Sequence, residues 1–206
     1  TSLPRGNDLP RYPEAALAAE YGSDPLLPAV RLLCEKLNSP IPRPIARDAA
    51  IALLRETEGA VATAANNVFG KAAQEWLAPL WSDLAAAIAG YPFDSGQETL
   101  HAAPLLLLAE RWSDAVALIE SIASWRRQPA PLAWMIEARS RIAGFDVIWP
   151  LLAELAWMAP PRAQALAPRL SLPGLDRLVR GFDAEFEADG TPDDFAWFPA
   201  WALIAD

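Results

Sequence analysis

The acidic run at residues 183–189 comes nearest in this sequence to a ligand-binding spacing. Counted from Glu185, acidic residues fall at the first, third, fifth and ninth positions and Gly190 at the sixth, as in a calcium-binding loop. The pattern then fails, because Pro192 stands at the eighth position and Ala196 at the twelfth, where such a loop needs a bidentate glutamate. We therefore expect a solvated helix end and a capping turn here, and no metal site.

Histidine and cysteine, which most often bind zinc or take part in nucleophilic catalysis, occur once each, as His101 and Cys34. A single cysteine excludes an internal disulfide and a thiolate cluster, and its leucine neighbours predict a small buried side chain. His101 has no motif neighbours for zinc or for a nucleophile and its base, and it is expected in the first turn of a helix. No glycine-rich phosphate loop occurs. We predict no catalytic residue, no metal and no cofactor, and hence a protein that is not an enzyme.

Arg139 is the polar residue whose position is most informative. On the helix expected at residues 132–143 it lies opposite the polar stripe, on the same side as Met135 and Ile142. A cation on an apolar face needs a carboxylate or a route to water. Two interpretations stay open: a structural ion pair, with Glu154 of the next helix as its expected partner, or a groove position where Arg139 binds a partner's carboxylate.

Tryptophan is the most abundant aromatic residue, with nine copies, and most of them fall on apolar helix faces where core packing is the expected use. Trp197 and Trp201 stand four residues apart in the last expected helix, so they share one face. That face either anchors a partner, since tryptophan is enriched at interface hot spots, or docks back onto the core.

The elements that must position these residues all have helical patterns, and no stretch alternates in the manner of a strand. Residues 147–159 are apolar on every helix face except at Glu154, which predicts a central helix surrounded by the others. Residues 1–13 contain three prolines and a glycine without an apolar period and predict an extended arm, so we expect a single all-helical domain at residues 14–206. The expected helices span about residues 14–20, 25–38, 45–69, 76–89, 97–110, 113–127, 132–143, 147–159, 160–170, 175–186 and 192–204.

Composition excludes some classes of partner. The net charge is −9 and the Lys and Arg residues are scattered, with Arg126 and Arg127 as the densest pair, so we expect no nucleic-acid partner. No signal peptide and no apolar run long enough to span a bilayer occurs, which predicts a cytoplasmic location and no membrane contact.

A family pattern is present within residues 133–161: an early aromatic residue, a small residue one turn later, a glycine turn, another small residue and a closing proline. With one residue fewer in the turn, this segment resembles a tetratricopeptide repeat, and residues 111–115 resemble the start of the second helix of another copy. Trp149 departs from the pattern, because the second helix should carry a small residue there. The positions that carry the resemblance, which covers residues 111–161 in all, are Trp134, Ala138, Gly144, Ala156 and Pro161.

The resemblance implies antiparallel helix pairs stacked as a tetratricopeptide-like array, with Met135, Arg139 and Ile142 lining a groove. A multihelical bundle is the alternative architecture. Three functions follow: a non-enzymatic scaffold that binds a protein or peptide, a bundle that binds an apolar small molecule in an aromatic-lined cavity with Arg139 anchoring its acid group, or a homodimer formed through Trp197 and Trp201.

Overall fold

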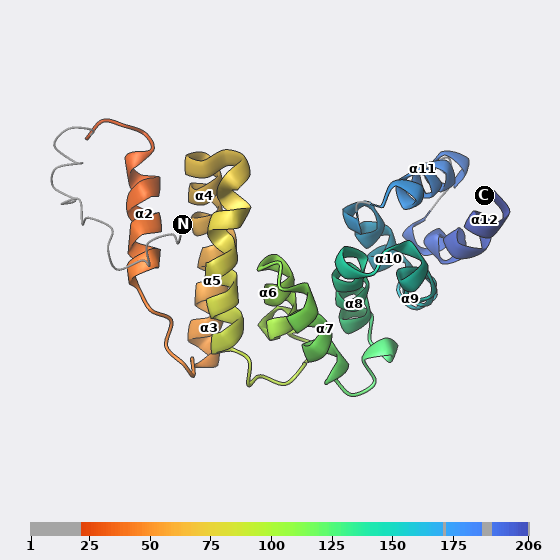
Figure 1. Cartoon of the computed structure of the whole chain (residues 1–206), viewed down its shortest axis with the longest axis horizontal. Helices are drawn as coiled ribbons and strands as arrows, with labels where there is room; N and C mark the ends of the chain where they lie inside the picture. Colours follow the sequence, from red (N-terminus) through yellow and green to blue (C-terminus); the bar gives the residue numbers. More distant parts are fainter. Residues whose placement is uncertain (1–21, 171, 187–190, 206) are drawn as a thin grey trace, which may run out of the picture. The chain divides into compact units, whose positions relative to one another are not determined.

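The computed structural model describes residues 22–170, 172–186 and 191–205, and every regular element in these ranges is a helix (Figure 1). The prediction of an all-α protein is confirmed for this part of the chain. The arm expected at residues 1–13 and the helix expected at residues 14–20 lie outside the described residues.

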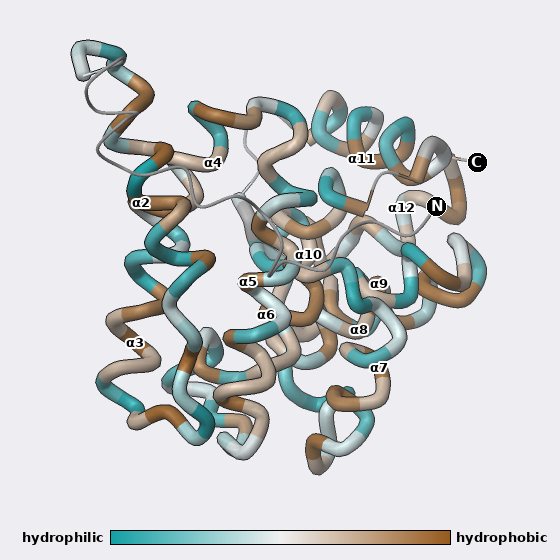
Figure 2. Tube along the Cα trace, turned by 60° about the vertical axis from the view of Figure 1, so that its left-hand side comes forward, coloured by the Kyte–Doolittle hydropathy of each residue, from teal (hydrophilic) through white to brown (hydrophobic). Residues whose placement is uncertain are grey.

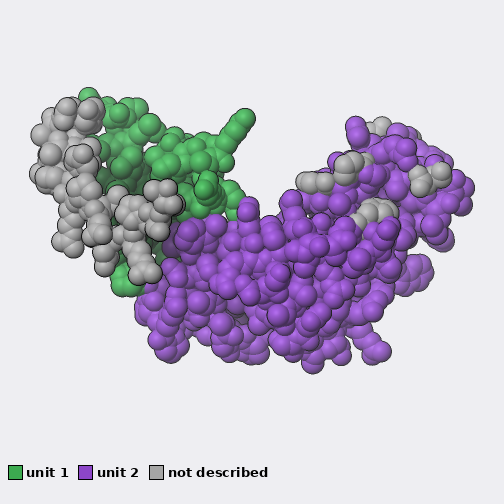
Figure 3. Space-filling view, in the orientation of Figure 1, with its two compact units in different colours: residues 1–40, 52–77 green, residues 41–51, 78–206 purple. Residues whose placement is uncertain are grey.

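The chain divides into two compact units, which we describe separately (Figure 3). The first contains residues 1–40 and 52–77, and the second contains residues 41–51 and 78–206. The single domain expected at residues 14–206 stays a prediction, because compactness alone does not show whether either unit folds without the other.

A helix that changes its winding supplies residues 52–69 to the first unit, while its first residues, 47–51, belong to the second. Within residues 47–69, α3 (Arg47–Glu56) and α4 (Ala62–Phe69) are joined by a π-helical turn, Thr57–Val61, so the helical path continues through Gly59. The buried Thr57 hydroxyl donates to the carbonyl of Leu53 at 2.7 Å, which satisfies its polar group. Helix α2 (Leu27–Asn38) packs on α4 through the buried Leu33. Cys34 is exposed, so the prediction that it is buried is wrong.

The second unit holds both candidate sites, and besides residues 41–51 it contains the chain from residue 78 onward, which lies within α5 (Ala73–Ala87) at its start. Each helix from α6 to α10 packs against the next one, and α8 also packs against α6 and α10. Apolar and polar residues alternate along α11, as in a helix with one buried face (Figure 2). The helices of this unit after α5 are α6 (Ala102–Leu108), α7 (Trp112–Glu120), α8 (Pro129–Ile142), α9 (Phe145–Met158), α10 (Pro160–Leu166), α11 (Pro173–Phe186) and α12 (Phe198–Ala205).

Two helix boundaries in this unit differ from the expected ones for local reasons. Helix α6 begins only at Ala102, because His101 is extended and forms its N-terminal cap. Helix α7 ends at Glu120, earlier than expected, and the left-handed φ of 54° at Ser124 prevents it from continuing to residue 127. Residues 121–128, which we call the connecting loop, therefore link α7 to α8 and include the 3-10 turn Trp125–Arg127.

The structure corrects the role of α9. Ile148, Leu152 and Leu155 are fully buried, but Val147 is 44% exposed and Trp157 is 77% exposed. The prediction of a helix surrounded on every side is therefore wrong, and α9 has one open face. No helix in the described part of the chain is long and apolar enough to cross a membrane.

Candidate functional site

The connecting loop is shaped at its end by proline. Gln128 precedes Pro129, and an X-Pro step favours extended backbone at X; Gln128 has φ −123° and ψ 120°. Pro129 then begins α8, where a missing N–H costs nothing. The side-chain amide nitrogen of Gln128 donates to the backbone carbonyl of Ala123 at 2.8 Å, so the two residues are linked across the loop.

A second loop, residues 88–97, is held by polar contacts within the same unit. Tyr91 donates its hydroxyl hydrogen to the carbonyl of Ile45 at 2.7 Å. The Asp94 carboxylate accepts from the N–H of Gly96 at 2.9 Å and from Arg47 at 3.2 Å. These contacts hold the loop that carries Tyr91, Phe93 and Asp94.

An open pocket of about 570 Å³ lies among residues of these two loops, with His101 in its wall. We call it the imidazole pocket. Its lining combines aromatic and aliphatic side chains with a few polar groups, which is the usual composition of a small-molecule site. The lining residues are Ala89, Tyr91, Pro92, Phe93, Asp94, Ser95, His101, Leu118, Ser121, Ile122, Ala123 and Gln128.

The His101 ring is fixed on several sides. His101 is only 4% exposed. Its Nδ1 accepts a hydrogen bond from the N–H of Ala103 at 3.2 Å, and His101 thereby caps the N-terminus of α6. The imidazole stacks on the indole of Trp134 with ring centroids 5.7 Å apart and planes 4° apart. Phe93 meets both rings edge-on, at 6.0 Å from His101 and 5.7 Å from Trp134. The ring therefore cannot turn without breaking these contacts.

The protonation state of His101 follows from this environment. Burial lowers the pKa of His101 below its ordinary value, so the ring is neutral near pH 7. Since Nδ1 accepts a hydrogen bond, the hydrogen-bonding pattern assigns the proton to Nε2. This Nε2–H has no hydrogen-bond partner among the described residues. Every described side-chain nitrogen or oxygen that is fully enclosed does have a hydrogen-bond partner. Nε2 is therefore accessible, and His101 lines the imidazole pocket.

The other polar groups of the pocket do not form a catalytic set with His101. Ser121 donates its hydroxyl hydrogen to the carbonyl of Leu118 at 2.6 Å. Among the hydrogen bonds of the described residues, none joins His101 to Ser121, Ser95 or Asp94, so no nucleophile is paired with a base in this conformation. No group of three metal-binding side chains occurs in the described ranges, and residues 187–190 of the acidic run lie outside them.

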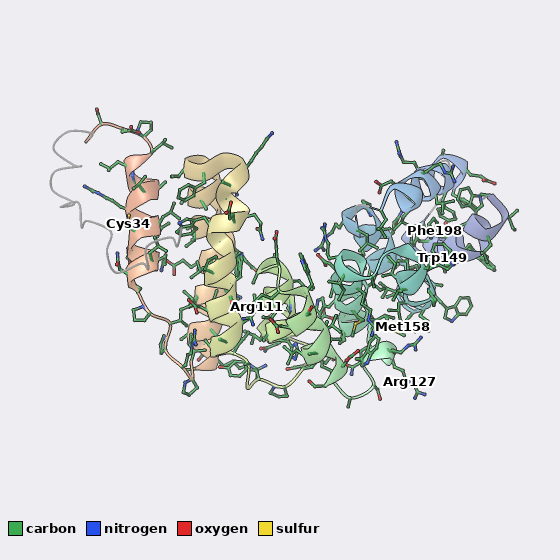
Figure 4. The ribbon with its side chains drawn as sticks, in the orientation of Figure 1. Cys34, Arg111, Arg127, Trp149, Met158 and Phe198 are labelled. Carbon is green, nitrogen blue, oxygen red and sulfur yellow. The ribbon has the colours of Figure 1, made fainter. Side chains whose placement is uncertain are left out.

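A second hollow, of about 580 Å³, lies at the surface beside the C-terminal end of α9. Its residues are Arg126, Arg127, Glu154, Trp157 and Met158, which we call the tryptophan patch. Figure 4 shows Arg127 on the connecting loop near Met158 at the end of α9. Trp157 is 77% exposed and Met158 38% exposed, which is unusual for side chains of this size.

The two arginines of the tryptophan patch differ in their ion pairing. Arg126 forms a bidentate ion pair with Glu154, in which Nε lies 3.1 Å from Oε2 and Nη2 donates to Oε1. The hydrogen bonds to Glu154 and its charge raise the pKa of Arg126, and the pair ties the connecting loop to α9. The guanidinium of Arg127, by contrast, pairs with no residue that the structure describes.

The structure corrects the ion-pair partner predicted for Arg139. Arg139 pairs with Glu120 at 3.0 Å and not with Glu154, which is bound by Arg126. The Arg139–Glu120 pair supports the structural interpretation of this residue. Met135 is completely buried and cannot contact a partner, whereas Ile142 is 51% exposed. None of Met135, Arg139 and Ile142 lines either hollow.

The two C-terminal tryptophans have different surroundings. Trp197 is 64% exposed. Trp201 donates its indole N–H to Glu185 at 2.6 Å, and its ring lies against Gly181, where an added Cβ would be 2.9 Å from the ring. Trp201 also meets Phe182 edge-on at 5.6 Å. Trp201 is thus a packing residue, and only Trp197 of the pair presents an open face.

Sequence reasoning missed Trp157, Arg127 and His101 as site residues. Trp157 was assigned to a buried helix, although Pro160 just after it marks the helix end, where fewer neighbours cover a side chain. The Arg126–Arg127 pair was visible as the densest basic pair. His101 was correctly placed near a helix start, but the aromatic rings that surround it come from residues distant in sequence.

Comparison with known proteins gives no relative. No protein-family model matches the chain, and neither the curated proteins nor the solved structures contain a significant match. The functional argument therefore depends on the geometry of the two hollows.

Proposed function

We propose that this protein is a non-enzymatic helical-repeat scaffold that binds a protein or peptide partner at the tryptophan patch. The observation that carries the proposal is Trp157, which is 77% exposed beside the unpaired guanidinium of Arg127. Tryptophan and arginine are the residue types most enriched among the hot spots of protein interfaces.

The packing of the second unit supports the scaffold part of the proposal. Each helix from α6 to α10 packs on the next, and α8 packs on α6 and α10 as well. In repeat arrays each element contacts mainly its neighbours, so an open face remains along the array. The tetratricopeptide-like arrangement and the cytoplasmic location belong to this proposal.

The charges of the patch define the chemistry of the partner. Glu154 neutralises Arg126, so Arg127 is the cation that remains for a partner. A guanidinium binds carboxylates in a bidentate manner, while Trp157 and Met158 offer apolar surface next to it. The partner segment therefore carries an acidic residue close to an aromatic or aliphatic one.

A display selection tests this proposal. Random peptides are selected on the wild-type chain, and the affinities of the enriched peptides are then measured for Trp157→Ala, Arg127→Ala and Trp197→Ala variants. We expect peptides with an acidic residue beside an apolar one. Trp157→Ala should weaken them about 30-fold, as for a typical hot spot, and Arg127→Ala about 10-fold.

Trp197→Ala is the matched control, since Trp197 is also largely exposed but lies away from the patch. It should leave these affinities unchanged. Peptides that bind the Trp157→Ala chain as well as wild type would overturn the proposal. If only Trp197→Ala abolished the binding of the selected peptides, the binding face would instead lie at the C-terminal helix.

Self-association is a second candidate, favoured by the exposure of α12. Leu203 is 76% exposed and Ile204 87% exposed, and Trp197 precedes the same helix. Exposed apolar surface of this kind often marks an interface. Sedimentation over a wide concentration range should show a dimer that an Ile204→Ser variant does not form, and a monomer at all concentrations would exclude it.

A further inference from the structure

We propose that the imidazole pocket binds a neutral, largely apolar ligand with a carbonyl acceptor, of the class of aromatic amides, and that His101 Nε2–H donates to that acceptor. The proposal does not depend on the tryptophan patch, because the two hollows share no lining residue.

His101 is a preorganised donor. Its ring is held by the Ala103 N–H, by Trp134 and by Phe93, so little conformational entropy is lost when a ligand binds. Its only free polar atom is Nε2, because Nδ1 is occupied. Because Nε2 is accessible from the pocket and has no protein partner, its N–H is available to a ligand acceptor.

The charges around the pocket select a neutral ligand. No Lys or Arg lines it, and its one carboxylate, Asp94, already accepts from Arg47 and from the N–H of Gly96. An anionic ligand would find no counter-ion and would face Asp94. A cation would be repelled by the N–H of His101 and would compete with Arg47 for Asp94.

The walls and the remaining acceptors point to an amide. Tyr91, Phe93, Leu118 and Ile122 supply apolar surface for a ring, and a volume of about 570 Å³ suits a small molecule. The Gln128 amide nitrogen donates to Ala123, which leaves its oxygen without a partner in the described structure. A primary amide offers an oxygen for His101 and an N–H for an acceptor of this kind.

NMR of the imidazole nitrogens tests the proposal directly, because His101 is the only histidine and gives one pair of signals. The chain is titrated with four probes of similar shape. Benzamide is neutral with an acceptor, benzoate is an anion, benzamidine is a cation without an acceptor, and ethylbenzene has no polar group.

We expect benzamide to shift the protonated Nε2 signal and to bind at least fivefold more tightly than each of the other three. Absence of a benzamide shift, or equal binding of benzoate or ethylbenzene, would overturn the proposal. These titrations need no variant, so they do not depend on how a substitution affects folding.

Two substitutions then separate the donor from the cap. His101→Asn keeps an acceptor where Nδ1 caps α6 but removes the Nε2 donor, and His101→Gln keeps a donor near Nε2 but loses the cap. Benzamide affinity, measured by calorimetry, should fall about fivefold to tenfold in His101→Asn and less in His101→Gln, as for one hydrogen bond. Unchanged affinity in a folded His101→Asn chain would show that His101 does not bind the ligand.

Discussion

The imidazole pocket and the tryptophan patch share the connecting loop but present their key residues in opposite ways. His101 is 4% exposed and held by three neighbours, whereas Trp157 is 77% exposed. The first site offers one directed hydrogen bond, and the second offers apolar area beside a free cation. A small, fixed polar group suits a small ligand, whereas an exposed aromatic residue suits a macromolecular surface.

The largest change in the free energy of unfolding is expected for Trp134, and almost none is expected for Trp157. Trp134 supports the His101 ring by stacking, so Trp134→Ala should lower the free energy of unfolding by about 3 kcal/mol. Trp157→Ala should change it by less than about 0.5 kcal/mol, because its side chain faces solvent. Urea denaturation followed by circular dichroism measures both. Equal losses would mean that Trp157 is a packing residue, and the contrast between the two sites would fail.

The pH dependence of stability tests the environment of His101. In the unfolded chain the histidine has its ordinary pKa of 6.5, and in the folded chain burial lowers it. Between these two values the unfolded state binds more protons, so the free energy of unfolding falls as the pH drops below 6.5. The stabilisation is fully present above that pH.

The control for this prediction is His101→Asn, which cannot titrate in this range. The stability of this variant should lack the pH-dependent contribution of His101. Parallel curves for wild type and His101→Asn between pH 7 and about pH 5 would contradict a lowered pKa.

Substitutions at Ser124 test the backbone conformation of the connecting loop. Its φ of 54° is unfavourable for residues with a Cβ, and most unfavourable for β-branched ones. Ser124→Gly should raise the free energy of unfolding by about 0.5 kcal/mol, and Ser124→Val should lower it by about 1 kcal/mol. Thermal unfolding of the three chains should give the order Gly, Ser, Val; a Val chain as stable as wild type would argue against the left-handed conformation.

The smallest expected effect concerns Asp94. Its ion pair with Arg47 is about half exposed on both sides, so Asp94→Asn should change stability by less than about 0.5 kcal/mol. The same substitution removes the negative charge of the imidazole pocket and should narrow the affinity difference between benzamide and benzoate. Isothermal calorimetry with both probes measures this, and an unchanged ratio would show that Asp94 does not set charge selectivity.

Helix positions followed from the sequence because local signals determine them. The capping turn expected after the acidic run is present at Thr191, where the Asp194 carboxylate accepts from the N–H of Thr191. The expected end of the helix at residues 132–143 was also close, since α8 ends at Ile142 and Gly144 follows with φ 81°. Proline, glycine and capping residues act over a few positions, so a single sequence contains the information.

Side-chain environment was predicted less well because it depends on partners far along the chain. Arg139 was assigned to Glu154 by helix faces alone, yet Glu120 is its partner. Cys34 was assigned to the core by its neighbours, yet it is exposed. Periodicity identifies which residues share a face, but only the packing of other helices decides whether that face is covered.

The connecting loop contributes residues to both hollows. The residues of the loop that line the imidazole pocket are Ser121, Ile122, Ala123 and Gln128, while Arg126 and Arg127 are the two cationic residues of the tryptophan patch. A ligand that shifts this loop therefore changes the affinity of the patch for its partner by some factor. Linkage then requires the partner to change the affinity for the ligand by the same factor, so a small molecule and a protein would each report the presence of the other.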